Sequence, residues 1–149
     1  MKKTIILSLV FILLAFQASA YKQEDLDKLK ATNACKECDL TKANLREARL
    51  TKANLNGAYL NGANLRGANL RDAYLVGADL RDAYLRFAYL QEAKLRFANL
   101  FRANLLAAYL TGIDEDATTH DADLTWATLS PAIFCRTIMP DMKMINDDC

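Results

Sequence analysis

Residues 38–57 read CDLTKANLREARLTKANLNG, and the pattern that they set continues as far as residue 110. Leucine occupies every fifth position from Leu40 to Leu110. A small residue stands two places before each leucine: Cys38 in the first unit and alanine in all the others. Fifteen consecutive five-residue units therefore share one pattern, in which a small residue and a leucine recur in fixed register.

A period of five fits neither a regular helix nor a flat strand. A helix repeats its buried face about every 3.6 residues and a strand every two, so leucines five apart would drift around a helix by roughly 140° per step. The spacing suits a chain that bends after every unit and points the small residue and the leucine inward. Four such units make a coil of about 20 residues, and successive coils stack at roughly 4.8 Å.

Units such as residues 63–67 (ANLRG) and 78–82 (ADLRD) resemble the pentapeptide repeat family. The resemblance covers about half of the chain in unbroken register. It implies an all-β fold, a right-handed quadrilateral parallel β-helix. It implies little about function, because a fold does not by itself specify an activity and this family includes many proteins of unknown role.

The first twenty residues have the order of a secretory signal peptide. Lys2 and Lys3 precede an apolar run over residues 4–16, and Ala18-Ser19-Ala20 is a small-residue cleavage site. A membrane anchor is the alternative, but the apolar run is shorter than the roughly 20 residues that a spanning helix needs. We expect the mature protein to begin at Tyr21, to work in the periplasm or outside the cell, and to have no membrane association after cleavage.

The remaining chain divides into three segments around the leucine ladder. Residues 21–37 are expected to form an N-terminal capping helix, with acidic residues early and lysines late, as the helix dipole favours. Residues 38–110 are the regular repeats. Residues 111–149 are expected to form an interrupted final coil and a C-terminal cap, since alanine and leucine return at Ala122 and Leu124 one residue out of phase.

Charge is nearly balanced over the whole chain but unevenly distributed. The 19 basic and 18 acidic residues give a net charge of +1, which becomes about −1 without Lys2 and Lys3. Residues 39–110 carry eleven basic and six acidic residues, whereas residues 111–149 carry two and eight. A near-neutral exported chain is a poor candidate for binding nucleic acid, which needs a basic surface.

Four cysteines in an exported chain predict two disulfides. In the stacked fold, Cys35 and Cys38 lie at one end and Cys135 and Cys149 at the other, which favours the pairings Cys35–Cys38 and Cys135–Cys149. The C-x-x-C spacing of the first pair also occurs in redox-active and metal-binding sites. Because both residues occupy inward-facing slots of the repeat, we expect a structural disulfide.

The break after Leu110 contains the other candidate site residues. Carboxylates gather there at Asp114, Asp116, Asp121 and Asp123, and such a group can bind calcium. The glycine and distal glutamate of an EF-hand loop are missing, so a solvated acidic loop is the favoured interpretation. His120 lies beside them without a nucleophile to activate, and we predict no catalytic residue and no cofactor.

Arginine and aromatic residues gather on the outside of the later coils. If each coil takes about 20 residues, Arg46, Arg66 and Arg86 fall in one column. The predicted interaction surface consists of Arg66, Arg86, Phe87, Arg96, Phe97 and Phe101. This composition is typical of protein–protein hot spots. An aromatic residue that merely supports its neighbours is the alternative.

The sequence thus predicts a non-enzymatic, exported scaffold that binds another protein. The alternative is a DNA mimic like the family members that bind DNA gyrase. That function requires a cytoplasmic, strongly acidic rod, and this sequence departs from both requirements.

Overall fold

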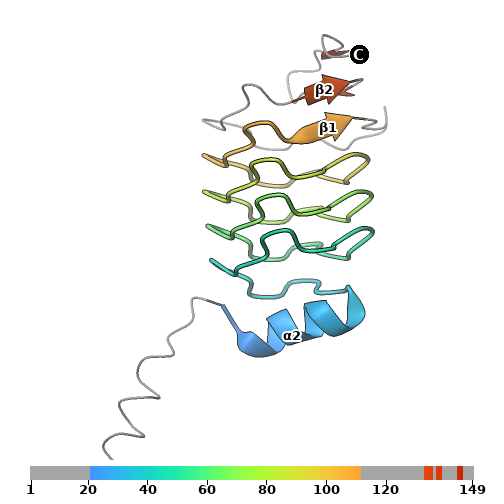
Figure 1. Cartoon of the computed structure of the whole chain (residues 1–149). Coiled ribbons are helices and arrows are strands. Elements are labelled where there is room, and N and C mark those ends of the chain that lie inside the picture. Colours follow the sequence, from blue (N-terminus) through green and yellow to red (C-terminus); the bar gives the residue numbers. More distant parts are fainter. Residues whose placement is uncertain (1–20, 112–132, 136, 139–143, 146–149) are drawn as a thin grey trace, which may run out of the picture.

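The computed structural model describes residues 21–111, 133–135, 137–138 and 144–145. Coils stack between a helix at one end and a pair of strands at the other (Figure 1). The expected signal peptide, the acidic break with His120, and Cys149 with its expected partner bond to Cys135 lie outside the described residues. The elements are α2 (Gln23–Thr32), β1 (Tyr109–Thr111), β2 (Ile133–Cys135), β3 (Thr137–Ile138) and β4 (Met144–Ile145).

Helix α2 forms because its charges and its apolar residues both suit a short helix at the end of the stack. Glu24 and Asp25 lie in the first turn and Lys30 in the last, as the helix dipole favours. Leu26 and Leu29 are buried against the first coil. The helix ends at Asn33, which has a left-handed φ of 54° and donates its N–H to the carbonyl of Leu29.

The coils are joined by short parallel bridges between equivalent residues of successive coils, from Ala34↔Asn54 to Tyr89↔Tyr109. In the regular units, the leucine N–H and the N–H two residues later donate to the following coil. The N–H before the leucine donates to the preceding coil, as Asn64 does to Ala43 at 3.0 Å. Each coil therefore contains four five-residue units. We name the four stacks of units the Leu40, Leu45, Leu50 and Leu55 columns, after the leucine of each that comes first in the chain.

A tight turn follows each ladder leucine from Leu40 to Leu105. The alanine N–H donates to the leucine carbonyl three residues before it, as Ala43 does to Leu40 at 3.0 Å. The second turn residue has a φ between 55° and 66° in all fourteen of these turns, from Lys42 to Ala107, and Glu37 has the same conformation after Cys35. The first turn residue of the described units does not have a positive φ. This is the geometry of a type II turn, in which glycine fits best at the second position. Only Gly57, Gly62, Gly67 and Gly77 satisfy that preference.

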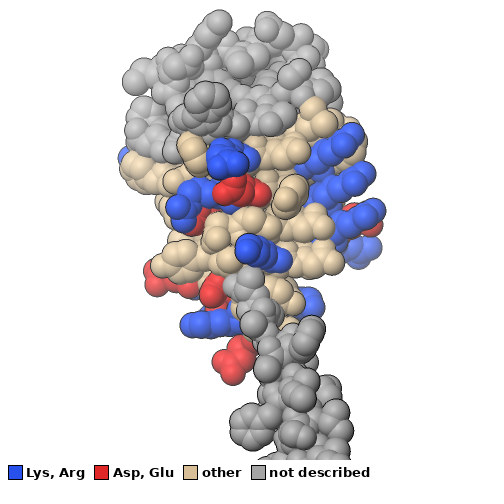
Figure 2. Space-filling model, turned by 90° about the vertical axis from the view of Figure 1, so that its left-hand side faces the viewer, with Lys and Arg blue, Asp and Glu red and all other residues tan. Residues whose placement is uncertain are grey.

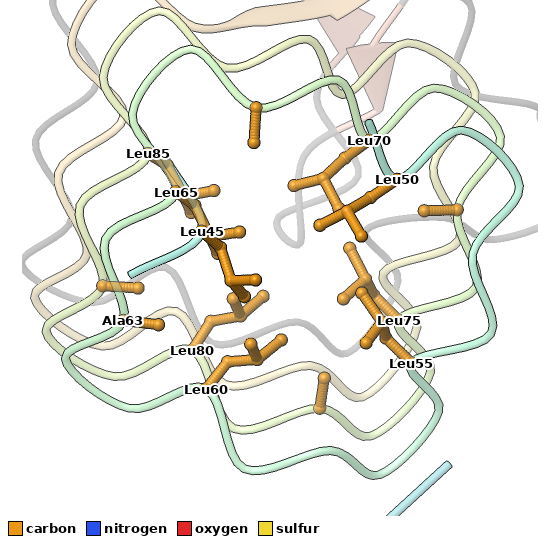
Figure 3. Close-up of a cluster of buried hydrophobic side chains, with 14 of the residues drawn as sticks. Leu45, Leu50, Leu55, Leu60, Ala63, Leu65, Leu70, Leu75, Leu80 and Leu85 are labelled. Carbon is orange, nitrogen blue, oxygen red and sulfur yellow. The ribbon is translucent and has the colours of Figure 1, made fainter. Parts of the chain in front are cut away.

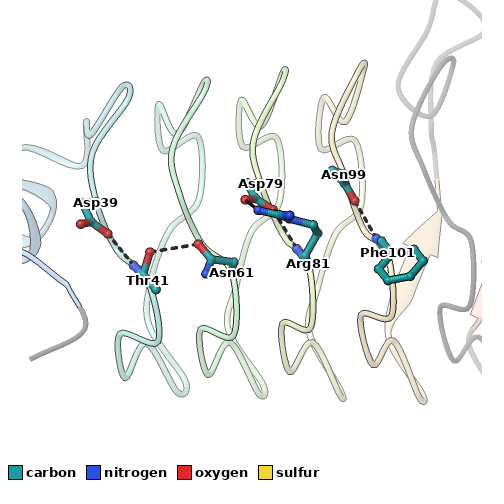
Figure 4. A network of polar contacts seen from close by, with 7 residues as sticks. All are labelled: Asp39, Thr41, Asn61, Asp79, Arg81, Asn99 and Phe101. Atoms are coloured by element: carbon teal, nitrogen blue, oxygen red, sulfur yellow. Dashed lines mark hydrogen bonds and ion pairs between the residues drawn. The ribbon is translucent and has the colours of Figure 1, made fainter.

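The residue before the leucine explains why asparagine and aspartate recur in the repeat. Its side-chain oxygen accepts the N–H of the first turn residue, the one backbone N–H of the unit that no neighbouring coil or turn satisfies. Thr41 donates in this way to Asp39, and Phe101 donates to Asn99 (Figure 4). All eight Asn and Asp residues at this position accept such a bond: Asp39, Asn44, Asn54, Asn64, Asn69, Asp79, Asn99 and Asn104. The side chain thus completes the hydrogen bonding of the unit.

The ladder side chains fill the inside of the stack. From Leu55 to Leu105 each ladder leucine is at most 1% exposed, and leucine lies over leucine along each column (Figure 3). The ladder alanines are equally buried, except for Ala48, which is partly buried. Deleting a leucine side chain from such a core costs about 2–5 kcal/mol.

Strand β2 continues the stack in parallel with β1, with Leu110 opposite Phe134. These partners are further apart in the sequence than the partners of the bridges in the regular coils. Strands β3 and β4 form a separate antiparallel pair. No helix among the described residues is long and apolar enough to cross a membrane.

Candidate interaction surface

Two arginines of the Leu45 column enclose a phenylalanine. The guanidinium carbon of Arg86 lies 4.8 Å from the ring centroid of Phe87, and that of Arg66, one coil earlier, lies 5.7 Å from it. The ring is still 38% exposed. Each contact is within the range of a cation–π interaction, worth about 0.5–1 kcal/mol at an exposed site. The three residues form one ordered patch, which we call the Phe87 cluster.

Phe87 occupies a position that its own backbone disfavours. It is the second residue of a turn, with a φ of 61°. A side chain in this left-handed region costs roughly 1 kcal/mol relative to glycine, which its neighbour Gly67 supplies one coil earlier. Phe97 occupies the same position with a φ of 60°, and these two are the aromatic residues among the eleven non-glycine residues found there. Locally unfavourable residues that remain exposed are candidates for function.

Phe97 forms a second cluster with Arg96 on the Leu55 column. The guanidinium carbon of Arg96 lies 4.6 Å from the Phe97 centroid, and the ring is 52% exposed. Phe101 belongs to the Leu40 column, where it is half-buried. The six residues of the predicted interaction surface therefore lie in three different columns. The structure brings Arg66, Arg86 and Phe87 together, pairs Arg96 with Phe97, and leaves Phe101 apart from both.

A third cluster lies on the Leu50 column. The rings of Tyr89 and Tyr109 stack 4.9 Å apart and nearly parallel, as their spacing of one coil predicts. Arg71 lies over Tyr89 at 5.5 Å and donates to Gln91. Arg71 was not among the predicted surface residues. Its place in the same column as Tyr89, one coil earlier, is the signal that would have found it.

The strongest ion pair of the described surface is Asp79–Arg81. Two guanidinium nitrogens of Arg81 donate to the Asp79 carboxylate at 2.8 and 2.6 Å, and its backbone N–H donates as well (Figure 4). Partial burial tends to raise the pKa of Asp79, but the hydrogen bonds and the charge of Arg81 outweigh it, so the pKa lies below its ordinary value. The same contact raises the pKa of Arg81. This pair neutralises charge on the Leu40 column.

Basic side chains remain gathered elsewhere on the stack. Figure 2 shows Lys and Arg atoms in a column along one edge of the coils. In the Leu45 column, Arg46 pairs with Glu47 at 3.1 Å, whereas Arg66 and Arg86 make no ion pair among the described residues. Their positive charges are therefore available to a partner beside the Phe87 ring.

The disulfide Cys35–Cys38 is present, and both residues are buried as the register predicts. The structure adds a neighbour that sequence reasoning missed. Asp25, on α2, places a carboxylate oxygen within 4.8 Å of both sulfurs, so the three residues could hold a metal ion after reduction. In the disulfide form the sulfurs are not available as thiolate ligands, and the Asp25 carboxylate accepts the N–H of Asp39 at 2.8 Å.

The described fold and its repeat register identify the class of protein. The pattern of the family described as pentapeptide repeats (8 copies) matches residues 38–77 and 78–114, just over half of the chain. The chain belongs to the pentapeptide repeat family, whose members adopt a right-handed β-helix.

Three solved structures are similar to this chain. A pentapeptide repeat protein from the Arabidopsis thaliana thylakoid lumen is 26% identical, covering 89% of this chain and 79% of that one, with a TM-score of 0.40. HetL, involved in heterocyst differentiation regulation in the cyanobacterium Nostoc, is 29% identical over 75% and 66%, with a TM-score of 0.32. A protein from the cyanobacterium Cyanothece is 26% identical over 76% and 95%, with a TM-score of 0.28. No curated protein matches the sequence.

Proposed function

We propose that this protein is a non-enzymatic binding module that presents the Phe87 cluster to another protein. The observation that carries the proposal is the pair of guanidinium groups, from Arg66 and Arg86, held against a ring that stays 38% exposed. Arginine and aromatic side chains dominate the energetics of protein interfaces. Here the ring of Phe87 stands at a backbone position that costs stability, which favours a role in binding over a role in folding.

The mechanism of such a module is presentation on a rigid support. Every coil is hydrogen-bonded to its neighbours, and the ladder leucines beneath the cluster are fully buried. Outward side chains therefore have a fixed backbone spacing and lose little further freedom on binding. The Arg96–Phe97 pair on the Leu55 column is a second, smaller surface of the same kind.

We also propose three details of the architecture: a quadrilateral cross-section, an N-terminal helical cap and a second disulfide. Four units per coil support a quadrilateral cross-section. The burial of Leu26 and Leu29 and the bond from Asp39 to Asp25 support α2 as an N-terminal cap. A second disulfide, Cys135–Cys149, would close the other end.

We further propose that the protein is exported and works in the periplasm or outside the cell, with residues 1–20 removed. The order of charges and apolar residues in that segment supports this location. The disulfide Cys35–Cys38 is consistent with it, since disulfides persist in oxidising compartments. N-terminal sequencing of the protein from the cell envelope or medium should give Tyr21 as the first residue.

The partner is proposed to be a protein and not a nucleic acid, and no cofactor is required. A DNA mimic would need an acidic surface, whereas the described coils display the arginines of the Leu45 column. We therefore do not favour gyrase binding for this chain.

Affinity capture from the envelope fraction tests the proposal. Immobilised wild-type protein should retain at least one protein that the double variant Arg86→Glu, Phe87→Ser does not retain. The control Lys42→Glu changes an exposed charge at the second turn position of the Leu40 column and should capture the same protein as wild type. Melting curves establish that all three are folded. Identical capture by the double variant would refute the Phe87 cluster as the binding surface.

A further inference from the structure

At the N-terminal end of the coil stack, the edge N–H groups of one half have acceptors and those of the other half, which we call the open half, do not. In regular coils, the N–H before each ladder leucine donates to the preceding coil, but the first coil has no predecessor. Ala34 donates instead to the Thr32 hydroxyl, and Asp39 donates to the Asp25 carboxylate. The equivalent N–H groups of Asn44 and Arg49 have no acceptor among the described residues. Helix α2 and its flanking residues therefore provide acceptors for this N–H in two units of the first coil and provide none in the other two.

The carbonyl groups of the open half are unpaired in the same way. In later coils, the residue before the leucine and the residue after it each accept an N–H from the preceding coil, as Asn64 and Arg66 do. The carbonyls of Asn44, Arg46 and Arg49 accept none within the described part of the chain. Unpaired donors and acceptors along an exposed strand edge are the features to which an extended peptide adds.

A hollow lies against this open edge. Its volume is about 390 Å³, within the range of ligand pockets, and it is lined by residues of the C-terminal half of α2 and of the first coil. Its lining residues are Leu29, Lys30, Asn33, Asn44, Leu45, Arg46, Ala48, Arg49 and Leu50. Ala48 is the one ladder alanine in the described coils that is not fully buried. The hollow thus reaches apolar core side chains that every later coil covers.

The rim of the hollow is basic. Lys30 comes from α2, and Arg46 and Arg49 come from the first coil. Glu47 is the nearest acidic partner in the sequence, and it is bonded to Arg46 through two guanidinium nitrogens. Lys30 and Arg49 make no ion pair among the described residues. An occupant of this hollow would therefore meet uncompensated positive charge at its edge and an apolar floor.

We propose that this open half is a docking site for a short, acidic, extended segment of a partner protein. Backbone carbonyls of the segment would accept the N–H groups of Asn44 and Arg49, in the manner of the preceding coil that the chain lacks. An apolar side chain would rest on Leu45, Ala48 and Leu50, while carboxylates would pair with Lys30 and Arg49. The site is separate from the Phe87 cluster and does not depend on it.

Amide exchange measured by NMR on the mature chain tests the backbone part of this proposal. Without a ligand, the amides of Asn44 and Arg49 should exchange fast. Those of Asn64 and Asn69, one coil later in the same columns, should be protected by their bonds to Ala43 and Ala48. The probe is the peptide acetyl-Asp-Ile-Asp-Ile-Asp-amide at saturation, which should slow exchange at Asn44 and Arg49 at least tenfold.

Fluorescence anisotropy with the same labelled peptide tests the charge. Arg49→Glu should weaken binding at least tenfold, and the lysine peptide acetyl-Lys-Ile-Lys-Ile-Lys-amide should not bind. The control Lys94→Glu changes a lysine at the equivalent repeat position in another column and should bind within twofold of wild type. Lys30→Glu provides a second variant on a different element, in case Arg49→Glu fails to fold.

Three outcomes would overturn the proposal. The first is binding that is unaffected by both Arg49→Glu and Lys30→Glu. The second is binding that leaves the Asn44 and Arg49 amides unprotected. The third is protection of these amides that rises with protein concentration in the absence of peptide, which would assign the edge to a second copy of the chain.

Discussion

The second coil (residues 54–73) and the third coil (residues 74–93) share one core but differ on the outside. In the second, three of the four units have an asparagine that accepts its turn N–H, and three have glycine at the left-handed position. In the third, Asp79 is the only such acceptor within its own unit and Gly77 the only such glycine. Tyr74, Tyr84 and Tyr89 take the three vacated asparagine positions, and Asp82 and Phe87 take the two vacated glycine positions.

The comparison distinguishes the buried ladder residues, which form the coil, from the outward-facing residues, which are available for binding. The third coil keeps every ladder residue, so it stacks like its neighbour. Most of its outward positions lack the asparagine or aspartate before the leucine and the glycine at the second turn position that the turn prefers. The coil still forms because the hydrogen bonds between coils remain. The Phe87 cluster lies at such an outward position.

The largest expected effect tests whether the two cores are equivalent. Leu65→Ala and Leu85→Ala each remove a fully buried side chain of the Leu45 column, and each should lower the free energy of unfolding by about 2–5 kcal/mol. Urea denaturation of both variants measures this. Losses that differ by more than about 3 kcal/mol, the full width of that range, would show that the two cores are not equivalent and that the aromatic surface of the third coil also supports its core.

A smaller effect is expected from exchanging residues before the leucine. Asn64→Tyr removes the acceptor of the Arg66 N–H and should cost about 1 kcal/mol. Tyr84→Asn supplies that acceptor to the Arg86 N–H, which has none among the described residues, and should gain a similar amount. Thermal melts of both variants and of the double exchange check the prediction. A loss of stability in Tyr84→Asn would show that the exposed tyrosine ring itself stabilises the coil.

The smallest effect concerns the ion pair of the third coil, which the second coil lacks because Tyr59 stands at the equivalent position. The pKa of Asp79 is lower when folded, so its contribution is complete above the ordinary pKa near 3.8 and is lost as the pH falls through the folded value. Arg81 is half-exposed, so solvent screens the ion pair and its contribution should be smaller than the two effects above.

Asp79→Asn isolates this contribution because the amide oxygen can still accept the Arg81 N–H. The difference in stability between wild type and variant should be constant from pH 5 to 7 and should shrink below the ordinary aspartate pKa. Chemical denaturation across that range measures it. A difference that grows as the pH falls would contradict the assigned direction of the pKa.

Sequence reasoning went far for the coils and less far for the surface. Stacking of Tyr89 on Tyr109 follows from their spacing of one coil alone. The contact of Arg71 with the Tyr89 ring does not follow from the sequence, because a flexible arginine side chain can contact a ring, a carboxylate or water. For the same reason, the six predicted surface residues could be assigned to columns but not to a single patch. The position of Asp25 beside the disulfide depends on how α2 docks, which its own sequence does not specify.

The sequence by itself determined the coil, because leucines at every fifth residue are all buried only if the chain bends after each unit. The same register places Cys35 and Cys38 at inward-facing positions. Only the tertiary structure decided how the first coil ends. Whether an edge N–H finds an acceptor depends on where the short helix α2 lies across it. The helix supplies an acceptor, the Asp25 carboxylate, for the N–H of Asp39. It supplies none for the N–H groups of Asn44 and Arg49, because its length and its two buried leucines cover only part of the end of the stack.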